Sequence, residues 1–469
     1  MFVSRTGELS ALKKLYLKKT FQLAVVYGRR RVGKTTLLSE FVKDKPAIFF
    51  AAQEANEHLN LQLFSTEVYT FFKIPKSTGP FRDWHDAFSF IAEKATEQHF
   101  ILVIDEFPYL ATNKSITSIL QNIIDHKLKD TGLFLILCGS KISFMERQVL
   151  GSESPLFGRR TAQFRVEEFD YFDAAKMLPG VSNEDRIRYY ACVGGTPHYL
   201  SQIDPSLSFE ENLVSLYFEP QAYLYREPVM LLKQELREPA MYNSVISAIA
   251  TGLTRMNDIS TKIAEESSKT GKYITVLLDL RILSKEVPFN ENPELTRKTL
   301  YQLADNCFRF WYKYVFTNSV GIETGAGKLI AESIVFPDLP TFIGKPVFED
   351  ICRQYIIRKN KEKALPFIAS NFGTWWGTDK QEKMAADIDI VAHSKPHDKA
   401  LLCECKWRNE QTGVQEVKKL LEKTRLLPGY KEYHFMFFSK SSYTDAAYKM
   451  EQEQENLQLI TLDMLFDGD

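Results

Sequence analysis

The stretch that most constrains this chain is a glycine-rich loop at residues 28–35, which reads GRRRVGKT. It fits the pattern G-x-x-x-x-G-K-[ST], whose glycines let backbone N–H groups surround phosphate oxygens. The apolar run at 23–27 predicts a buried strand before the loop, and residues 36–41 predict the beginning of a helix after it. The alternative is a glycine-rich turn that fits by chance, and the flanking strand and helix disfavour it.

The loop and its helix define the candidate phosphate-binding residues, for which we expect ATP and Mg²⁺ as cofactors. Lys34 can reach the β- and γ-phosphates, and the Thr35 hydroxyl can bind Mg²⁺. The positive end of the helix dipole adds to the attraction for anions. The predicted nucleotide contacts of this region are Gly28, Arg29, Arg30, Arg31, Val32, Gly33, Lys34, Thr35 and Thr36.

Two further apolar strands end in polar residues. The run at 100–104 is followed by Asp105, which would hold Mg²⁺ through water, and by Glu106, which would orient and deprotonate the attacking water. The alternative for this acidic pair is a helix cap or a solvated turn. The run at 133–138 leads to Ser140, which can sense the γ-phosphate or simply cap the next helix.

An arginine pair, Arg159 and Arg160, follows the third of these strands. A guanidinium group can neutralise phosphate charge in a transition state, either within one chain or from a neighbouring subunit. The alternative is a surface pair bound to nearby carboxylates such as Glu167 and Glu168. Both interpretations of Arg159 stay open.

Composition sets the class of protein. A length of 469 residues predicts roughly three domains. No apolar run approaches the roughly 20 residues of a membrane helix, and no signal peptide is visible, so we expect a cytoplasmic protein without a membrane partner. The six scattered cysteines are typical of reduced thiols. A net charge of −1 excludes general attraction to nucleic acid.

The order of the patterns predicts several domains. Strands alternate with helices over 1–164, which indicates a parallel α/β sheet, and residues 165–235 are helical in pattern. Residues 236–290 predict a winged helix-turn-helix unit that offers Lys269, Lys272 and Arg281 to phosphates, or alternatively a structural or protein-binding module. An aromatic helical linker at 291–330, with a glycine-flanked break at 321–327, and a C-terminal domain at 331–469 complete the prediction.

A second candidate site lies in the C-terminal domain. Its strands at 387–391 and 400–407 put Asp387 and Asp389 on one face, and Glu404 and Lys406 on one face of the next strand. Two carboxylates and a lysine that meet across adjacent strands can bind Mg²⁺, generate hydroxide and stabilise charge on a phosphodiester. This is the arrangement of the PD-(D/E)xK nucleases, and the upstream Glu349 is a further candidate ligand.

The alternative for this site is an ordinary cross-strand salt bridge. Cys403 and Cys405 alternate with the charged pair among apolar residues, and this enclosure favours a catalytic site. Residues 331–469 hold 19 Lys and Arg against 22 Asp and Glu, so the domain has no general affinity for DNA. A substrate would have to be held by other domains or by a partner.

Motifs along nearly the whole chain resemble the archaeal-type ATPase family of AAA+/STAND-like P-loop proteins. They are Phe2-x-x-Arg5-x-x-Glu8-Leu9, the loop at 28–35, Ile104-Asp105-Glu106-Phe107, Gly139-Ser140, Pro155-Leu156-Phe157-Gly158-Arg159, Gly194-Gly195-Thr196-Pro197, Tyr301-x-x-x-Asp305-x-x-x-x-Phe310-Trp311, Ile388-Asp389-Ile390-Val391 and Glu404-Cys405-Lys406-Trp407.

The resemblance implies ATP binding and hydrolysis, a helical lid at 165–235, a winged helix at 236–290 and a PD-(D/E)xK nuclease-like domain at 331–469. It also implies that Phe2 and Arg5 approach the adenine and that Pro197 packs near it. One departure is Asp387, which stands where the resemblance predicts a glutamate and has a shorter reach.

Three hypotheses follow. The first is a Mg²⁺-dependent ATPase that controls a DNA-directed nuclease domain. The second is a STAND-like ATP switch whose C-terminal domain is non-catalytic and only binds DNA or protein. The third is a transcription regulator that acts through the winged helix. DNA, contacted through the winged helix and the C-terminal domain, is the expected macromolecular partner, and a homo-oligomer is compatible with each hypothesis.

Overall fold

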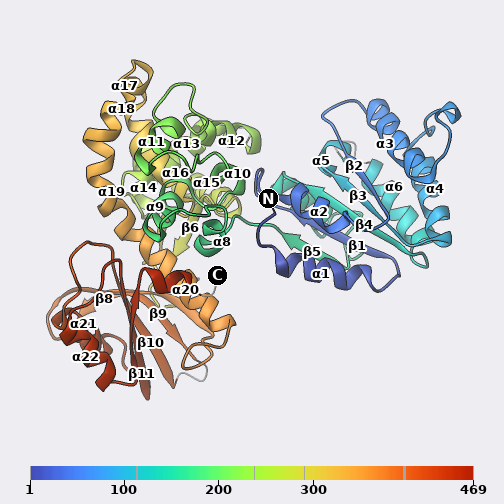
Figure 1. Ribbon diagram of the computed structural model, residues 1–469. Helices are drawn as coiled ribbons and strands as arrows, with labels where there is room; N and C mark the ends of the chain where they lie inside the picture. The colour runs from blue at the N-terminus through green and yellow to red at the C-terminus, as the bar shows by residue number, and fades with distance from the viewer. Residues whose placement is uncertain (1, 112–114, 237, 290, 395–397, 468–469) are drawn as a thin grey trace. The chain divides into compact units, whose positions relative to one another are not determined.

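The computed structural model describes residues 2–111, 115–236, 238–289, 291–394 and 398–467. The chain forms two compact units, residues 1–168 and residues 169–469 (Figure 1). Within the described ranges, no helix has both the length and the apolar character needed to cross a bilayer.

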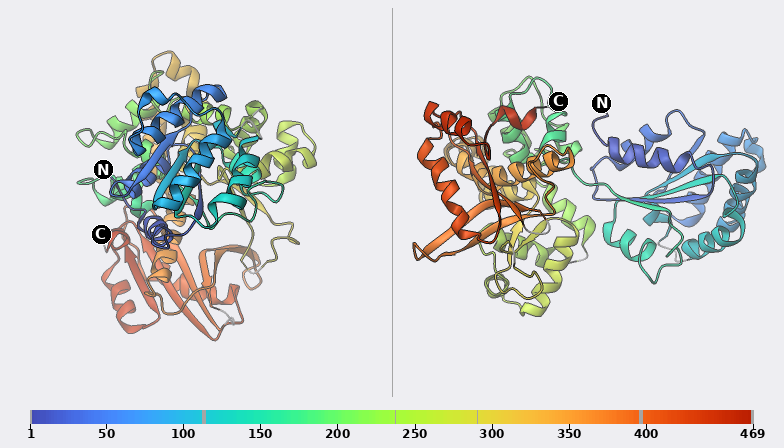
Figure 2. Two further views of the ribbon diagram at one scale, coloured as in Figure 1. Left: turned by 90° about the vertical axis from the view of Figure 1, so that its right-hand side faces the viewer. Right: turned by 90° about the horizontal axis from the view of Figure 1, so that it is seen from below.

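A five-stranded parallel sheet forms the centre of the first unit. Its strands are β1 (Gln22–Tyr27), β2 (Ala47–Ala51), β3 (Phe100–Asp105), β4 (Leu133–Gly139) and β5 (Ala162–Arg165), in the order β2-β3-β4-β1-β5. Every residue of β1, β3 and β4 is buried, because helices cover both faces of the sheet (Figure 2). The structure confirms the predicted parallel α/β sheet.

Helices on the two faces close the core of this unit. Residues of α1 and α2 pack on one face, and α3 and α4 pack around Phe50 of β2 on the other, where the rings of Phe64 and Trp84 lie 5.3 and 6.4 Å from Phe50. The helical segments are α1 (Thr6–Tyr16), α2 (Lys34–Val42), α3 (Glu57–Phe72), η1 (Lys76–Thr78), α4 (Trp84–Glu97), α5 (Phe107–Leu110), α6 (Ser115–Ile123), η2 (Ile124–Leu128), α7 (Ile142–Phe144) and η3 (Met145–Val149).

The second unit begins with helices, as the pattern at 165–235 predicts. They are α8 (Tyr171–Ala175), α9 (Asn183–Val193), α10 (Pro197–Leu200), α11 (Phe209–Tyr217) and α12 (Glu227–Glu235). Helix α9 ends before Gly194 and Gly195, and α10 starts at Pro197. Gly195 lies close to the backbone of Phe169, and an added Cβ would stand 1.9 Å from the Phe169 carbonyl oxygen.

Three helices and a two-stranded hairpin follow. The helices α13 (Pro239–Ala250), α14 (Met256–Ile263) and α15 (Ser267–Asp279) contact one another, and β6 (Leu283–Glu286) pairs antiparallel with β7 (Leu300–Leu303). The second strand therefore lies beyond residue 290, where the prediction ended this unit. The polar stretch after residue 290 belongs to the connection of the hairpin and does not separate two domains.

A long series of helical segments leads to the C-terminal sheet. The expected break at 321–327 is wrong, because only residues 324–326 are non-helical, Ile322 is fully buried and Gly327 packs against the Phe218 carbonyl. The segments are α16 (Asn306–Phe310), η4 (Trp311–Val315), η5 (Phe316–Asn318), α17 (Ser319–Glu323), α18 (Gly327–Ile330), η6 (Ala331–Val335), α19 (Phe336–Phe342), η7 (Ile343–Val347) and α20 (Phe348–Lys361).

The C-terminal sheet is mixed. It contains β8 (Asn371–Asp379), β9 (Met384–His393), β10 (Lys399–Lys406), β11 (Glu432–Ser439) and β12 (Leu457–Thr461), in the order β12-β11-β10-β9-β8. The pairs β8–β9 and β9–β10 are antiparallel, whereas β10–β11 and β11–β12 are parallel. The remaining helical segments are α21 (Val414–Glu422), η8 (Lys423–Leu426), α22 (Asp445–Glu453) and η9 (Asp463–Phe466).

Two glycine-to-alanine substitutions in the second unit should change stability in opposite directions. Gly195→Ala should lower the free energy of unfolding by about 1–3 kcal/mol, because its Cβ meets the Phe169 carbonyl at 1.9 Å. Gly271→Ala, inside α15 with its nearest neighbour 3.9 Å away, should raise it by about 0.5–1 kcal/mol. Urea denaturation checks both values, and equal effects would contradict this account.

Candidate functional site

The glycine-rich loop runs from the end of β1 to the start of α2. An added Cβ on Gly28 would lie 2.1 Å from the Val166 carbonyl oxygen, so only glycine permits the close approach of the loop to the chain beyond β5. Arg31 and Gly33 adopt left-handed backbone angles, with φ of 70° and 88°. The loop is thereby folded back over the first turn of α2, as a phosphate-binding loop requires.

Lys34 lies inside this loop. Its side chain is buried, and its Nζ donates hydrogen bonds to the carbonyl oxygens of Gly28 at 2.9 Å and Arg29 at 2.8 Å. Both acceptors are neutral, and anionic phosphate oxygens are stronger acceptors for an ammonium group. The position of Lys34 therefore suits a nucleotide phosphate that replaces these two bonds.

The candidate Mg²⁺-binding side chains are in direct contact. Thr35 Oγ1 donates to Asp105 Oδ2 at 2.7 Å, which joins the first turn of α2 to the end of β3. Asp105 is buried, and its Oδ1 accepts the backbone N–H of Glu106 at 2.9 Å. A hydroxyl and a carboxylate held together beside a phosphate loop fit the oxygen ligands of Mg²⁺.

Glu106 and Ser140 also contact each other. Glu106 has a left-handed backbone with φ of 49°, an uncommon conformation for a residue with a side chain. Its Oε2 accepts hydrogen bonds from Ser140 Oγ at 2.8 Å and from the Ser140 N–H at 3.4 Å. In the described part of the chain, no side chain caps α7, so the capping alternative for Ser140 is wrong. Its hydroxyl binds the candidate catalytic carboxylate instead.

The N-terminal motif reaches the phosphate loop. The Arg5 guanidinium donates to the Val32 carbonyl at 3.1 Å, to the Glu167 carbonyl and to Glu8 at 3.2 Å, while Phe2 packs against the cluster that contains Val32. The structure thus brings Phe2 and Arg5 to the loop, and their contact with adenine stays a prediction. Pro197, the third residue expected near adenine, begins α10 in the second unit.

Arg159 is held by its own unit. Its Nε and Nη2 bind the two carboxylate oxygens of Asp125 at 3.0 and 2.6 Å, and its Nη1 donates to the carbonyls of Pro155 and Phe157. The hydrogen bond from Arg159 lowers the pKa of Asp125. The alternative of a carboxylate partner is met by Asp125 of η2, and not by the examples Glu167 and Glu168. As it stands, the guanidinium anchors the loop at 151–160.

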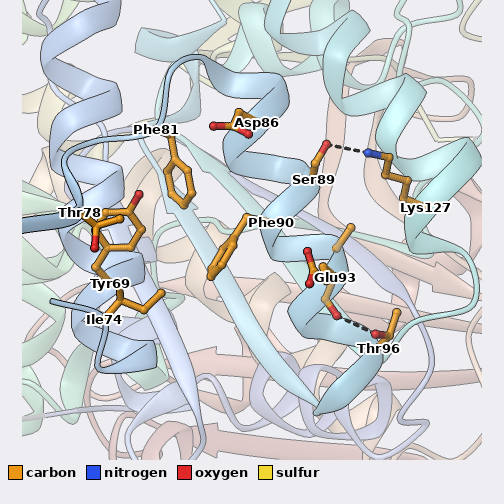
Figure 3. A pocket seen from close by; sticks show the side chains of 11 residues that line it. Tyr69, Ile74, Thr78, Phe81, Asp86, Ser89, Phe90, Glu93, Thr96 and Lys127 are labelled. Carbon is orange, nitrogen blue, oxygen red and sulfur yellow. Dashed lines mark hydrogen bonds between the residues drawn. The ribbon is translucent and has the colours of Figure 1, made fainter. Parts of the chain in front are cut away.

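A cavity of about 640 Å³ lies elsewhere in the first unit, between α3 and α4 (Figure 3). Tyr69, Phe81 and Phe90 line it, and Lys127 donates to Ser89 at 2.8 Å at one side. As far as the structure describes its walls, they include none of the predicted nucleotide contacts. The cavity therefore does not belong to the nucleotide site.

The second candidate site is built on β9, β10 and α20. Cys403 pairs with Ile390 in the antiparallel ladder, so the next step of the register places Glu404 opposite Asp389. Asp389 is buried, and its Oδ2 accepts the Cys405 N–H at 2.9 Å. Glu349, in the first turn of α20, is also buried. Three carboxylates predicted as ligands thus come from three elements of one domain.

These carboxylates repel one another. Burial and the negative charge of Asp389 raise the pKa of Glu349 to about 7. Burial and the charge of Glu404 raise the pKa of Asp389. A group of acids in which each disfavours ionisation of the next is relieved by a bound cation.

Three lysines already supply positive charge to this group. Glu404 binds Lys406 Nζ and Lys423 Nζ, both at 2.6 Å, and Lys345 Nζ lies 3.2 Å from Glu349 and 3.3 Å from Asp387. Sequence reasoning missed Lys345 and Lys423. The spacing of four residues between Lys345 and Glu349 was an available signal, whereas only the fold brings Lys423 of η8 to the site.

The lysines decide how the site can hold a metal ion. Among the residues that the structure describes, no three His, Cys, Asp or Glu side chains are grouped closely enough to hold one. The donors themselves, three carboxylates, are those that Mg²⁺ prefers. The residues therefore fit Mg²⁺ in kind. Binding would require the carboxylates to move closer together and the ammonium groups to move from the carboxylate oxygens.

Comparison with known proteins finds two protein families along the chain. Residues 2–203 match a family of ATPase domains predominantly from Archaea, and residues 311–420 match a family of archaeal and bacterial proteins of unknown function. The chain is 30% identical to the uncharacterized protein MJECL04 of Methanocaldococcus jannaschii over 435 residues, which are 92% of this chain and 94% of that protein.

Two further likenesses cover smaller shares of the chain. The uncharacterized ATP-binding protein MJ0423 of the same organism is 44% identical over 45 residues, which are 10% of this chain and 76% of that protein. The solved structure of the Walker-type ATPase PABY2304 of Pyrococcus abyssi has a TM-score of 0.51 at 19% identity, over 66% of this chain and 96% of that chain, and shares the fold. The chain therefore belongs to the archaeal-type ATPase family and carries a P-loop ATPase domain.

Proposed function

We propose that this protein binds and hydrolyses Mg²⁺–ATP and that the nucleotide state controls a Mg²⁺-dependent, DNA-directed nuclease site in the second unit. The contact of Thr35 with Asp105 at 2.7 Å beside the Lys34 loop carries the ATPase half. The nuclease half is supported by the charge interaction between Asp389 and Glu404 on adjacent strands, with Lys406 on the same strand as Glu404. The ATP-binding relative supports nucleotide binding.

In the ATPase site, each residue has one task. Lys34 neutralises the β- and γ-phosphates, and Thr35 with Asp105 would hold Mg²⁺. When bound, Mg²⁺ draws charge from the phosphate oxygens. Glu106 orients a water molecule and accepts its proton, while the Ser140 hydroxyl fixes the carboxylate that does so. Ser140 thus acts on the γ-phosphate through Glu106, and Arg159 acts by anchoring its loop.

In the proposed nuclease site, Glu349, Asp389 and Glu404 would hold Mg²⁺. When bound, the ion would act as a Lewis acid and lower the pKa of a water molecule. The N–H of Cys405 fixes the orientation of Asp389 at 2.9 Å. Lys406 and Lys423, once released from Glu404, place positive charge where a phosphodiester gains negative charge in its transition state.

One observation favours the alternative of a non-catalytic C-terminal domain. Both oxygens of Glu404 are engaged by lysines at 2.6 Å, so the acid is already neutralised. In that case the second unit would bind DNA or protein under the control of ATP. DNA contact through α15 and the hairpin is part of either proposal. Lys272 and Arg281 are exposed cations there, and Lys269 pairs with Glu265 at 2.8 Å.

Substitutions in the phosphate loop test the ATPase half. Lys34→Ala should abolish ATP turnover, because it removes the charge that faces the phosphates. Glu106→Gln should lower turnover at least about 100-fold and keep ATP binding, because only the proton acceptor is lost. Phosphate release and calorimetric titration measure the two effects. Lys43→Ala, exposed at the end of α2, is the control, and turnover by Lys34→Ala at the wild-type rate would contradict the proposal.

Substitutions in the second unit test the nuclease half on the full chain. With Mg²⁺ or Mn²⁺, Asp389→Asn and Lys406→Ala should each abolish DNA cleavage and leave ATP turnover unchanged, because they lie in a different unit from the phosphate loop. Lys419→Ala, exposed on α21, should cleave like the wild type. If the wild-type protein leaves every form of DNA intact and binds no Mn²⁺ in calorimetry, the switch hypothesis holds instead.

A further inference from the structure

A cavity of about 320 Å³ opens beside the carboxylates of the second unit. The β6–β7 hairpin forms one wall with Glu286 and Gln302, and β8 forms another with Trp376. Its floor includes Glu349, together with Lys345 and Asp387, which Lys345 links at 3.3 Å. Because Glu349 belongs both to this cavity and to the candidate metal site, a group bound here would be the direct neighbour of a phosphate bound there.

The walls of the cavity are fixed to one another. The Phe289 N–H, just after β6, donates to the Thr374 carbonyl of β8 at 2.8 Å, and the Phe289 ring is buried in the core of the C-terminal sheet. Arg353 of α20 binds Glu286 of the hairpin at 3.4 Å and the Thr374 hydroxyl at 3.0 Å. The hairpin and the sheet therefore hold a preformed space, which lowers the cost of ordering a ligand.

The charge of the lining selects the kind of ligand. Acids outnumber bases, which disfavours an anionic phosphate inside the cavity. Trp376 adds an aromatic side chain to the lining, and carboxylates with the Gln302 amide offer acceptors for amino groups. A neutral heterocycle that carries N–H groups suits such a lining. The charged residues that line the cavity are Glu286, Glu349, Asp350, Asp387, Lys345 and Arg353.

The volume of the cavity further limits which ligands it can hold. A cavity of about 320 Å³ is at the lower end of small-molecule sites and cannot admit a double helix. A nucleobase with its sugar is a group of this size, and bases commonly stack on aromatic side chains in sites for single strands.

We propose that this cavity holds one unpaired nucleobase of a DNA strand whose adjoining phosphate lies at Glu349, Asp389 and Glu404. The inference rests on the proposed nuclease function and adds to it a substrate class. A paired base is stacked in the duplex and enters such a cavity only after it is extruded, so the site favours single strands and frayed ends over blunt duplex. Trp376 is the residue that stacks on the base.

Binding to full-length protein with the Asp389→Asn substitution tests the proposal, because affinity is then measured with Mg²⁺ and without cleavage. Fluorescence anisotropy compares a labelled 12-nucleotide single strand with a blunt duplex of the same sequence. We expect roughly tenfold tighter binding of the single strand, and a five- to fiftyfold loss when Trp376→Ala is added. Trp376→Phe should stay within about threefold of the parent, because it keeps an aromatic face.

A second readout reports stacking directly. The fluorescence of a 2-aminopurine base in the single strand should be quenched by the parent and by Trp376→Phe, and not by Trp376→Ala. Thermal unfolding of each variant serves as the folding control. Equal affinity of the parent for both forms of DNA, or unchanged binding and quenching by a folded Trp376→Ala protein, would overturn the cavity assignment.

The outcomes also separate the two proposals. If wild-type protein cleaves no DNA, the nuclease function fails, while anisotropy and quenching still decide whether a base binds beside Trp376. If wild-type protein cleaves single-stranded and blunt duplex DNA equally, and Trp376→Ala leaves both rates and affinities unchanged, the nuclease function stands and the base cavity fails.

Discussion

Both candidate sites depend on one constraint, which is that a carboxylate largely shielded from water needs a donor or a cation beside it. In the first unit neutral donors meet this need, since Asp105 accepts from the Thr35 hydroxyl and Glu106 accepts from the Ser140 hydroxyl. In the second unit lysines meet the need, with Lys406 and Lys423 on Glu404. A cation can join the first group directly, whereas it has to displace ammonium groups from the second.

The sequence predicts the regular elements well where burial leaves a local pattern. Parallel strands covered on both faces appear as continuous apolar runs, so 100–104 and 133–138 were identified within one residue of β3 and β4. The β6–β7 pairing and the helices around 321–327 were missed because their polar residues and glycines are typical of loops. The polar connection after residue 290 concealed the pairing of Leu283 with Leu303, and Gly321 and Gly327 serve close packing in helices.

In the candidate sites too, some side chains could be predicted from the sequence and others could not. Motif spacing identifies Lys34, Thr35, Asp105 and Glu106, because the chain order of strand, loop and helix places them at one edge of the sheet. The pair of Arg159 with Asp125 joins residues 34 positions apart, and Lys423 reaches Glu404 across 19 positions. Side-chain contacts of this range leave no periodic trace in a sequence, so they emerge only from the folded chain.

The balance of charge in the second site bears on the proposed binding of a metal ion and a phosphodiester. Four carboxylates, Glu349, Asp387, Asp389 and Glu404, face three ammonium groups, which leaves one net negative charge. Burial and the charge of Asp389 raise the pKa of Glu349 to about 7, so a proton on Glu349 offsets part of that charge near neutral pH. If one divalent cation and one phosphodiester entered in place of the proton, the charge of the whole group would become zero. A purely structural salt bridge needs only equal numbers of acids and bases. The surplus acid here is the feature that supports the proposed exchange of a proton for a metal ion and a phosphate.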